Sequence, residues 1–99
     1  MKLRDIAYAR QGDKTDVANI CVFPHDEADW PALRERLTAE VVATKFAPLI
    51  HGTVTRYEFP VLHGLNFVMT AALAGGMSRS LRVDGTGKSY ASLMLDIDL

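Results

Sequence analysis

The N-terminal part of the sequence predicts two β-strands joined by a charged segment. In LRDIAYAR, residues 3–10, Ile6 and Tyr8 alternate with alanines, which is the period-two pattern of a half-buried strand. The run VANICVF, residues 17–23, is apolar on both faces and rich in β-branched residues, as a central strand is. The charged residues 11–16 make a connection longer than the usual hairpin loop of about two to five residues. We therefore expect this segment to have a function.

A helix and a third strand are expected next. Asp29 is placed to cap a helix over residues 30–46, in which apolar side chains recur three and four positions apart. Pro48 then stops it. The segment GTVTRYEF, residues 52–59, has the composition of a strand and is ended by a proline. Two strands joined through a helix of this length favour a right-handed parallel crossover.

The C-terminal third predicts a second helix, a short strand and a mixed end. LHGLNFVMTAAL, residues 62–73, has no clean polar face, so we expect a helix buried on most sides, against the sheet and a second subunit. SRSLRV, residues 78–83, is a candidate fourth strand. In residues 88–99 a helical start is followed by apolar alternation, and we expect some helix and some strand there.

Composition limits the classes of function. The chain has 99 residues, enough for one domain covering 1–99 with one modest core. A net charge of −1 gives no electrostatic basis for binding nucleic acid or anionic membranes, and it makes self-association easier. Cys21 is the single cysteine, and no Cys/His cluster has zinc-ligand spacing, so we expect no metal and no cofactor. The lack of a signal-like segment favours the cytoplasm.

The sequence GTGKS, residues 85–89, ends like a phosphate-binding P-loop but does not fit the full motif. The motif needs a glycine five positions before Gly87, where this chain has Arg82. Too few residues follow Lys88 for the elements that hold Mg²⁺ and orient the attacking water. We therefore do not predict nucleotide hydrolysis.

Two other segments are candidates for binding an anion. In GGMSRS, residues 75–80, backbone N–H groups, two hydroxyls and an arginine could surround a carboxylate or a phosphate, although a helix C-cap followed by solvated arginines explains the same residues. In the opening segment, Arg10 and Lys14 could hold an anion while Asp13 orients them or moves a proton, or the segment is a solvated turn. The candidate anion-site residues are Arg10, Gly12, Asp13, Lys14, Asp16, Gly75, Gly76, Ser78, Arg79 and Ser80.

Two asparagines interrupt apolar runs. Asn19 lies in the second predicted strand and Asn66 in the second predicted helix. A buried amide must have hydrogen-bond partners, so we interpret both as structural ties rather than catalytic groups. The catalytic residues, if there are any, are not identified by a motif.

Four blocks of the sequence, taken in order, resemble the C-terminal domain of AtuA-type acyclic terpene utilisation proteins. The blocks are AYARQGDKTDVANI, LTAEVV, RYEFPVLHGLNFV and LAGGMSRSLRVDGTGKS. The chain departs from the family pattern at Thr15, where the pattern has glycine, and at Gln11, Cys21 and Ala74. A side chain at position 15 penalises a left-handed backbone, so ligand geometry is affected more than the fold.

The resemblance implies a ferredoxin-like α+β sandwich, with helices on one face of a four- to five-stranded mixed sheet. It also implies a bacterial protein linked to the breakdown of acyclic terpenoids and branched acids through acyl-CoA chemistry. Our leading hypothesis is a small accessory subunit, as a homo-oligomer or with a separately encoded AtuA-like large subunit, without activity of its own. The alternative is a ligand-binding or catalytic domain in which the two candidate anion segments meet over one carboxylate, phosphate or acyl-CoA substrate.

Overall fold

The computed structural model describes residues 1–14, 17–48, 50, 52–70 and 90–99, with Asp13 and Lys14 described by their backbone alone. The predicted strand at 78–83, the sequence GTGKS and the whole GGMSRS candidate site lie outside the described residues, as does Asp16. Nothing in the structure therefore tests those predictions.

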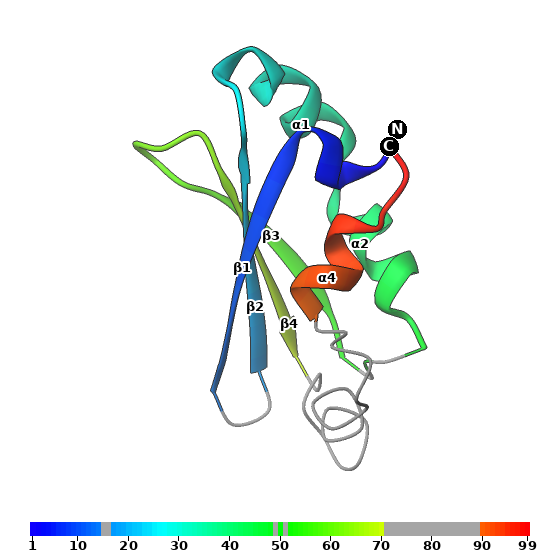
Figure 1. Cartoon of the computed structure of the whole chain (residues 1–99). Coiled ribbons are helices and arrows are strands. Elements are labelled where there is room, and N and C mark those ends of the chain that lie inside the picture. The colour runs from blue at the N-terminus through cyan, green and yellow to red at the C-terminus, as the bar shows by residue number, and fades with distance from the viewer. Residues whose placement is uncertain (15–16, 49, 51, 71–89) are drawn as a thin grey trace.

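Four strands form one antiparallel sheet (Figure 1). They are β1 (Ala7–Lys14), β2 (Val17–Pro24), β3 (Val54–Glu58) and β4 (Leu65–Thr70), arranged in the order β1-β2-β4-β3. All three pairings, β1 with β2, β2 with β4 and β4 with β3, are antiparallel. Within the described residues the expected mixed sheet is thus an antiparallel one.

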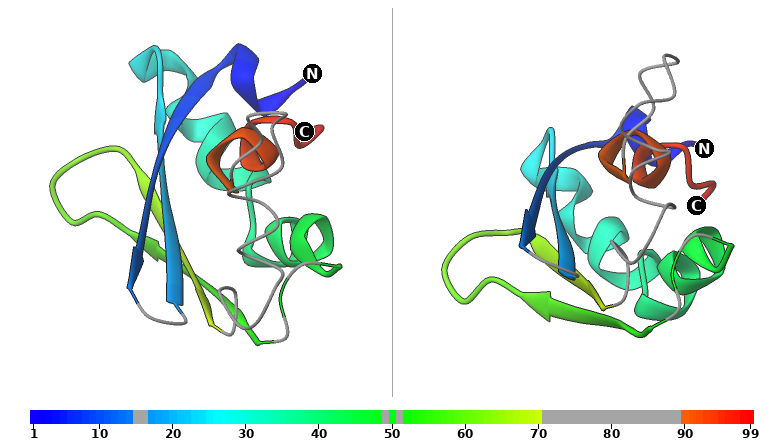
Figure 2. Two further views of the ribbon diagram at one scale, coloured as in Figure 1. Left: turned by 60° about the horizontal axis from the view of Figure 1, so that its bottom comes forward. Right: turned by 90° about the horizontal axis from the view of Figure 1, so that it is seen from below.

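The helices all pack on one side of this sheet (Figures 1 and 2). They are η1 (Leu3–Asp5), η2 (Glu27–Asp29), α1 (Trp30–Arg36), α2 (Ala39–Phe46) and α4 (Tyr90–Leu95). The two chain ends meet beside α4, where Leu99 N donates to the Met1 carbonyl at 2.8 Å. This two-layer arrangement confirms the predicted α+β sandwich with helices on one face.

The core lies between the sheet and the helices. Alternate residues of β2 and β4 point into it, and they meet fully buried side chains of the helical layer such as Leu33, Phe46 and Met94. The strand residues concerned are Ile20, Val22, Leu65, Phe67 and Met69. Each fully buried side chain of this size contributes about 1.5–3 kcal/mol. The sheet therefore has a buried inner face and a separate outer face.

The opening hairpin differs from its prediction. Residues 11–14 belong to β1, which pairs with β2 up to Lys14 opposite Val17, so only residues 15 and 16 separate the two strands. The prediction of a long polar loop was wrong because charged residues can continue a strand whose outer face is not buried. The length of the connection therefore no longer supports a function for this segment.

The predicted second helix was wrong for the part that the structure describes. Residues 65–70 form β4, with Leu65, Phe67 and Met69 buried and Asn66 and Val68 on the other face. A short apolar run fits a buried helix and a buried strand equally well by periodicity alone. Here β4 lies between β2 and β3, and its pairing on both edges decides the outcome.

The connection between β2 and β3 was predicted in part. Both strands are antiparallel to β4, so they run parallel to each other, but β4 separates them. The single helix predicted for 30–46 is two helices, because Thr38 adopts an extended backbone and its hydroxyl accepts from Val41 N at 3.1 Å to cap α2. The C-terminal segment forms helix α4 and one β-bridge between Lys2 and Asp98.

Candidate functional site

The outer face of the sheet is the face opposite the helices, and no described element covers it (Figures 1 and 2). Direct cross-strand partners share this face: Tyr8 faces Phe23, and Arg10 faces Cys21. Farther across the sheet Cys21 faces Asn66, which in turn faces Tyr57 of β3. One continuous surface thus runs across all four strands.

Large apolar side chains are exposed on this side. Among the described residues, the large hydrophobic side chains with high exposure are Tyr8 at 43%, Tyr57 at 55%, Leu62 at 59%, Val61 at 88% and the terminal Met1 at 54%. Tyr8 and Tyr57 belong to the outer face. Val61 and Leu62 belong to the β3–β4 loop, residues 59–64, which projects away from the helical layer (Figure 2). Apart from Met1, these exposed side chains lie on the side of the sheet that the described helices leave uncovered.

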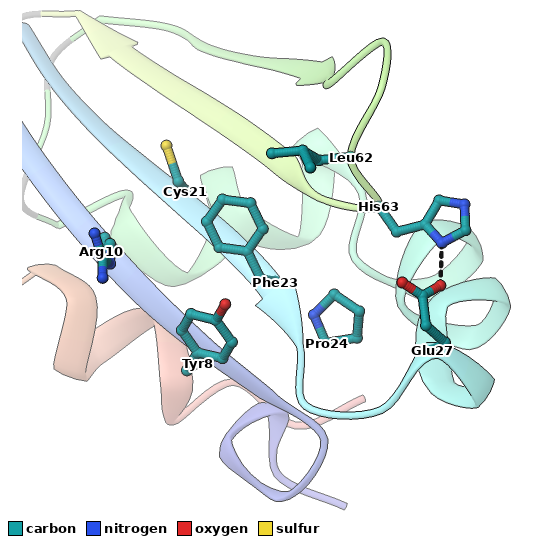
Figure 3. A pocket seen from close by; sticks show the side chains of 8 residues that line it. All are labelled: Tyr8, Arg10, Cys21, Phe23, Pro24, Glu27, Leu62 and His63. Carbon is teal, nitrogen blue, oxygen red and sulfur yellow. Dashed lines mark hydrogen bonds and ion pairs between the residues drawn. The ribbon is translucent and has the colours of Figure 1, made fainter.

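A groove of about 450 Å³ lies between the outer face and the β3–β4 loop. Arg10 and Cys21 stand at one end, the rings of Tyr8 and Phe23 in the middle, and the Glu27–His63 pair at the other end (Figure 3). Pro24 and Leu62 complete the lining. Its volume lies within the range of small-molecule pockets, and its walls are mostly apolar with a few polar groups.

Aromatic rings form a row along this side of the sheet. Tyr8 lies between His25 and Phe23, with ring centroids 5.6 Å and 5.5 Å away. Phe23 in turn stacks on Phe59 at 5.6 Å and 14°. Gly64 makes this stacking possible, since a Cβ there would lie 2.6 Å from the Phe23 ring. The row gives the groove a firm apolar wall.

One end of the groove is closed by a contact between distant segments. His63 Nδ1 of the β3–β4 loop lies against the Glu27 carboxylate of η2 in a short hydrogen bond, which becomes an ion pair when the imidazole is protonated. The His63 ring also stacks on Trp30 of α1, with centroids 5.2 Å apart and planes 6° apart. These two contacts fix the loop relative to the helical layer.

The two asparagines meet beside Cys21. Asn19 Nδ2 donates to Asn66 Oδ1 at 3.3 Å and lies 3.7 Å from Cys21 Sγ, which is itself 3.5 Å from Asn66 Oδ1. Gly12 is the cross-strand partner of Asn19, and a Cβ at Gly12 would lie 2.8 Å from the Asn19 amide oxygen. This side-chain network links β2 to β4 and engages the thiol.

The structure brings together part of the predicted anion site and leaves part of it outside the described residues. Arg10 and Gly12 lie on the outer face, and Asp13 and Lys14 are the last residues of β1. Asp16 and the predicted residues Gly75, Gly76, Ser78, Arg79 and Ser80 lie outside the described segments. Whether the two segments meet stays a prediction.

Sequence reasoning missed most of the groove. It did not select Tyr8, Phe23, Glu27, Leu62 or His63 as site residues. The alternation in β1 carried a signal for the first of these, because it places Tyr8 and Arg10 on one face. The residues of the β3–β4 loop were hidden by the helix wrongly expected at 62–73.

A separate charged cluster joins the two chain ends. Asp96 contacts Lys2 at 3.5 Å, Arg4 at 3.0 Å and Lys45 at 3.4 Å. The Lys2 ammonium, followed by a hydrogen bond from Lys45, lowers the pKa of the Asp96 carboxyl below its usual value. The cluster connects η1 and α2 to the C-terminal segment, so we interpret it as structural.

The described segments contain no group of three or more His, Cys, Asp or Glu residues placed to hold a metal ion. No helix within them combines the length and the apolar character needed to cross a membrane.

Within the described residues, an antiparallel four-stranded sheet with helices on a single face defines a two-layer α+β domain. The family model of the AtuA ferredoxin-like domain matches residues 1–99, and the chain belongs to this family. The match confirms the resemblance drawn from the four sequence blocks. No curated protein and no solved structure matches the chain.

Proposed function

We propose that this domain is an accessory interaction module whose outer face docks onto an AtuA-like large subunit. The observation that carries the proposal is the exposure of Tyr8, Tyr57, Val61 and Leu62 on the side of the sheet that the described helices leave uncovered. Tyrosine is one of the residues that supply most of the binding energy in protein interfaces, and apolar side chains around such residues exclude water. The fixed β3–β4 loop presents two of them without a large ordering cost.

On this proposal the domain contributes a surface and not a complete set of reacting groups. The Cys21 thiol is engaged by Asn19 and Asn66, and the Glu27 carboxylate by His63. Membership in the AtuA ferredoxin-like family supports a place in the cytoplasmic breakdown of terpenoids or branched acyl-CoA compounds, in which the large subunit carries the chemistry.

Co-expression tests the partnership. The domain is tagged and expressed with an AtuA-like large protein from the same organism, and we expect the two to co-purify. The double variant Val61→Asp/Leu62→Asp adds two charges to the exposed apolar residues of the β3–β4 loop, and we expect it to abolish co-purification. Thr44→Asp, on an exposed position of α2 in the helical layer, is the matched control and should leave co-purification intact.

Two results would contradict the proposal. One is a large protein that stays bound to the doubly charged variant. The other is a pure domain that dimerises in light scattering through the same surface, with the variant monomeric and the large protein never bound. In that case the outer face is an interface between two copies of this chain.

A further inference from the structure

Arg10 is a charged residue of the groove that has no partner among the other lining residues. The Arg10 side chain is exposed and forms neither a hydrogen bond nor an ion pair with any residue of the described segments. By contrast, Arg4 contacts Asp96 at 3.0 Å, and Arg34 contacts Glu58 at 3.0 Å. The exposed Arg36 of α1 also has no ion pair within the described segments, but it does not line the groove. A free guanidinium beside apolar walls is a planar, two-pronged donor suited to a carboxylate.

The other polar groups of the groove leave one place for an anion. Cys21 is held by the asparagine network, and Glu27 is held by His63 at the opposite end from Arg10 (Figure 3). The Glu27 carboxylate repels a second anion, whereas Arg10 attracts it. An anionic ligand is therefore oriented with its charge at the Arg10–Cys21 end.

The walls next to Arg10 define the rest of the ligand. Tyr8 and Phe23 form the cross-strand pair two residues along from Arg10 and Cys21, a step of about 7 Å along the strands. A molecule whose charge is on Arg10 thus lays its body across these rings and against Leu62. Ring stacking adds to apolar burial when the body is flat.

We propose that the groove is a binding site for a small carboxylate with an aromatic body. Arg10 holds the carboxylate, and the Tyr8–Phe23 row with Leu62 holds the ring. The proposal goes beyond the docking function and does not depend on it, because it concerns the isolated domain.

Calorimetric titration of the isolated 99-residue chain tests the site with three probes. They are naphthoate, its uncharged carboxamide, and octanoate, which keeps the carboxylate but has a flexible body. Losing a charge-assisted hydrogen bond weakens binding by at least about tenfold. We expect naphthoate to bind at least tenfold more tightly than the carboxamide and more tightly than octanoate.

Two variants localise the charge contact. Arg10→Gln should reduce naphthoate affinity to that of the carboxamide and leave carboxamide affinity unchanged. Arg36→Gln, at an exposed arginine of α1, is the matched control and should change neither. Circular dichroism verifies that each variant is folded. The comparison of naphthoate with its carboxamide uses the wild-type chain, so it tests the proposal even if a variant fails to fold.

Three results would overturn the proposal. They are no heat of binding with naphthoate, equal affinity of naphthoate and its carboxamide, and octanoate affinity equal to that of naphthoate. Because no partner protein is present, such a failure leaves the co-purification result untouched. In the same way, a failure of the co-purification experiment does not contradict ligand binding in the groove.

Discussion

Gly64 is the position where one added methyl group should disturb the outer face most directly. A Cβ there would lie 2.6 Å from two atoms of the Phe23 ring and 3.1 Å from the Phe59 ring. Carbon atoms prefer to stay about 3.5–4.0 Å apart, so the rings must separate. Phe23 has little room to move away, because Tyr8 packs on it at 5.5 Å. The cost of Gly64→Ala is therefore steric.

The size of the effect follows from three contributions. Overpacking costs about 1–3 kcal/mol, and weakening one aromatic pair costs about 0.5–1.5 kcal/mol. Against these, replacing glycine stabilises by about 0.4–1 kcal/mol through the unfolded chain. We expect a net loss of about 1–3 kcal/mol in the free energy of unfolding, measured by urea denaturation with circular dichroism. For a domain of this size each kcal/mol lowers Tm by about 4–8 °C.

A double-mutant cycle separates this steric cause from a general effect of the substitution. In the background of Phe23→Leu the ring is absent, so Gly64→Ala should cost much less than it does in the wild type. Equal costs in the two backgrounds, or an alanine variant as stable as the wild type, would refute the steric argument. Gln11→Ala on β1 is the comparison variant for the cost of losing a single contact. Among the described residues it removes the hydrogen bond that Ala91 N donates to Gln11 Oε1 at 2.8 Å.

Two other changes test the contacts between layers. Arg56 donates to the carbonyls of Arg34 and Leu37 at 2.7 and 2.9 Å, so Arg56→Met should lower the free energy of urea unfolding by about 1–3 kcal/mol; an unchanged value would contradict this role. Asp96→Asn should be less stable than the wild type at pH 7. Because the pKa of Asp96 is lowered in the folded state, its contribution is present above the unfolded pKa and is lost as pH falls through the folded pKa. The stability difference should therefore shrink toward pH 3, and a constant difference would contradict the assignment.

The sequence was sufficient for elements whose pattern has one interpretation. Alternation in β1 and the β-branched run of β2 gave both strands, and the order of the motif blocks gave the family. Residues 65–70 were ambiguous because β4 is central and apolar on most of both faces. The neighbours of a strand are distant in sequence, so no local pattern reports that β4 pairs with both β2 and β3.

Of the residues that line the groove, only Arg10 was selected from the sequence as a site residue, for the same reason. The groove lies between the outer face and the β3–β4 loop, which is joined to η2 by the contact of His63 with Glu27. These residues are 36 positions apart in the sequence. A contact between two exposed polar side chains leaves no periodic signal, whereas the buried alternation that fixed the strands does.

The proposed docking and the proposed ligand binding use the same side of the domain, so the two would be thermodynamically linked. Tyr8 and Leu62 belong both to the exposed apolar surface and to the lining of the groove. If a partner covers the groove, it removes water from around Arg10, and the attraction between its guanidinium and a carboxylate grows as the local dielectric constant falls. By linkage, whatever factor the ligand adds to partner affinity, the partner adds to ligand affinity. If the partner instead places its own acidic side chain on Arg10, it competes with the ligand and the coupling is negative. The effect of naphthoate on partner affinity therefore distinguishes the two cases: affinity rises if the partner encloses the ligand and falls if the partner displaces it.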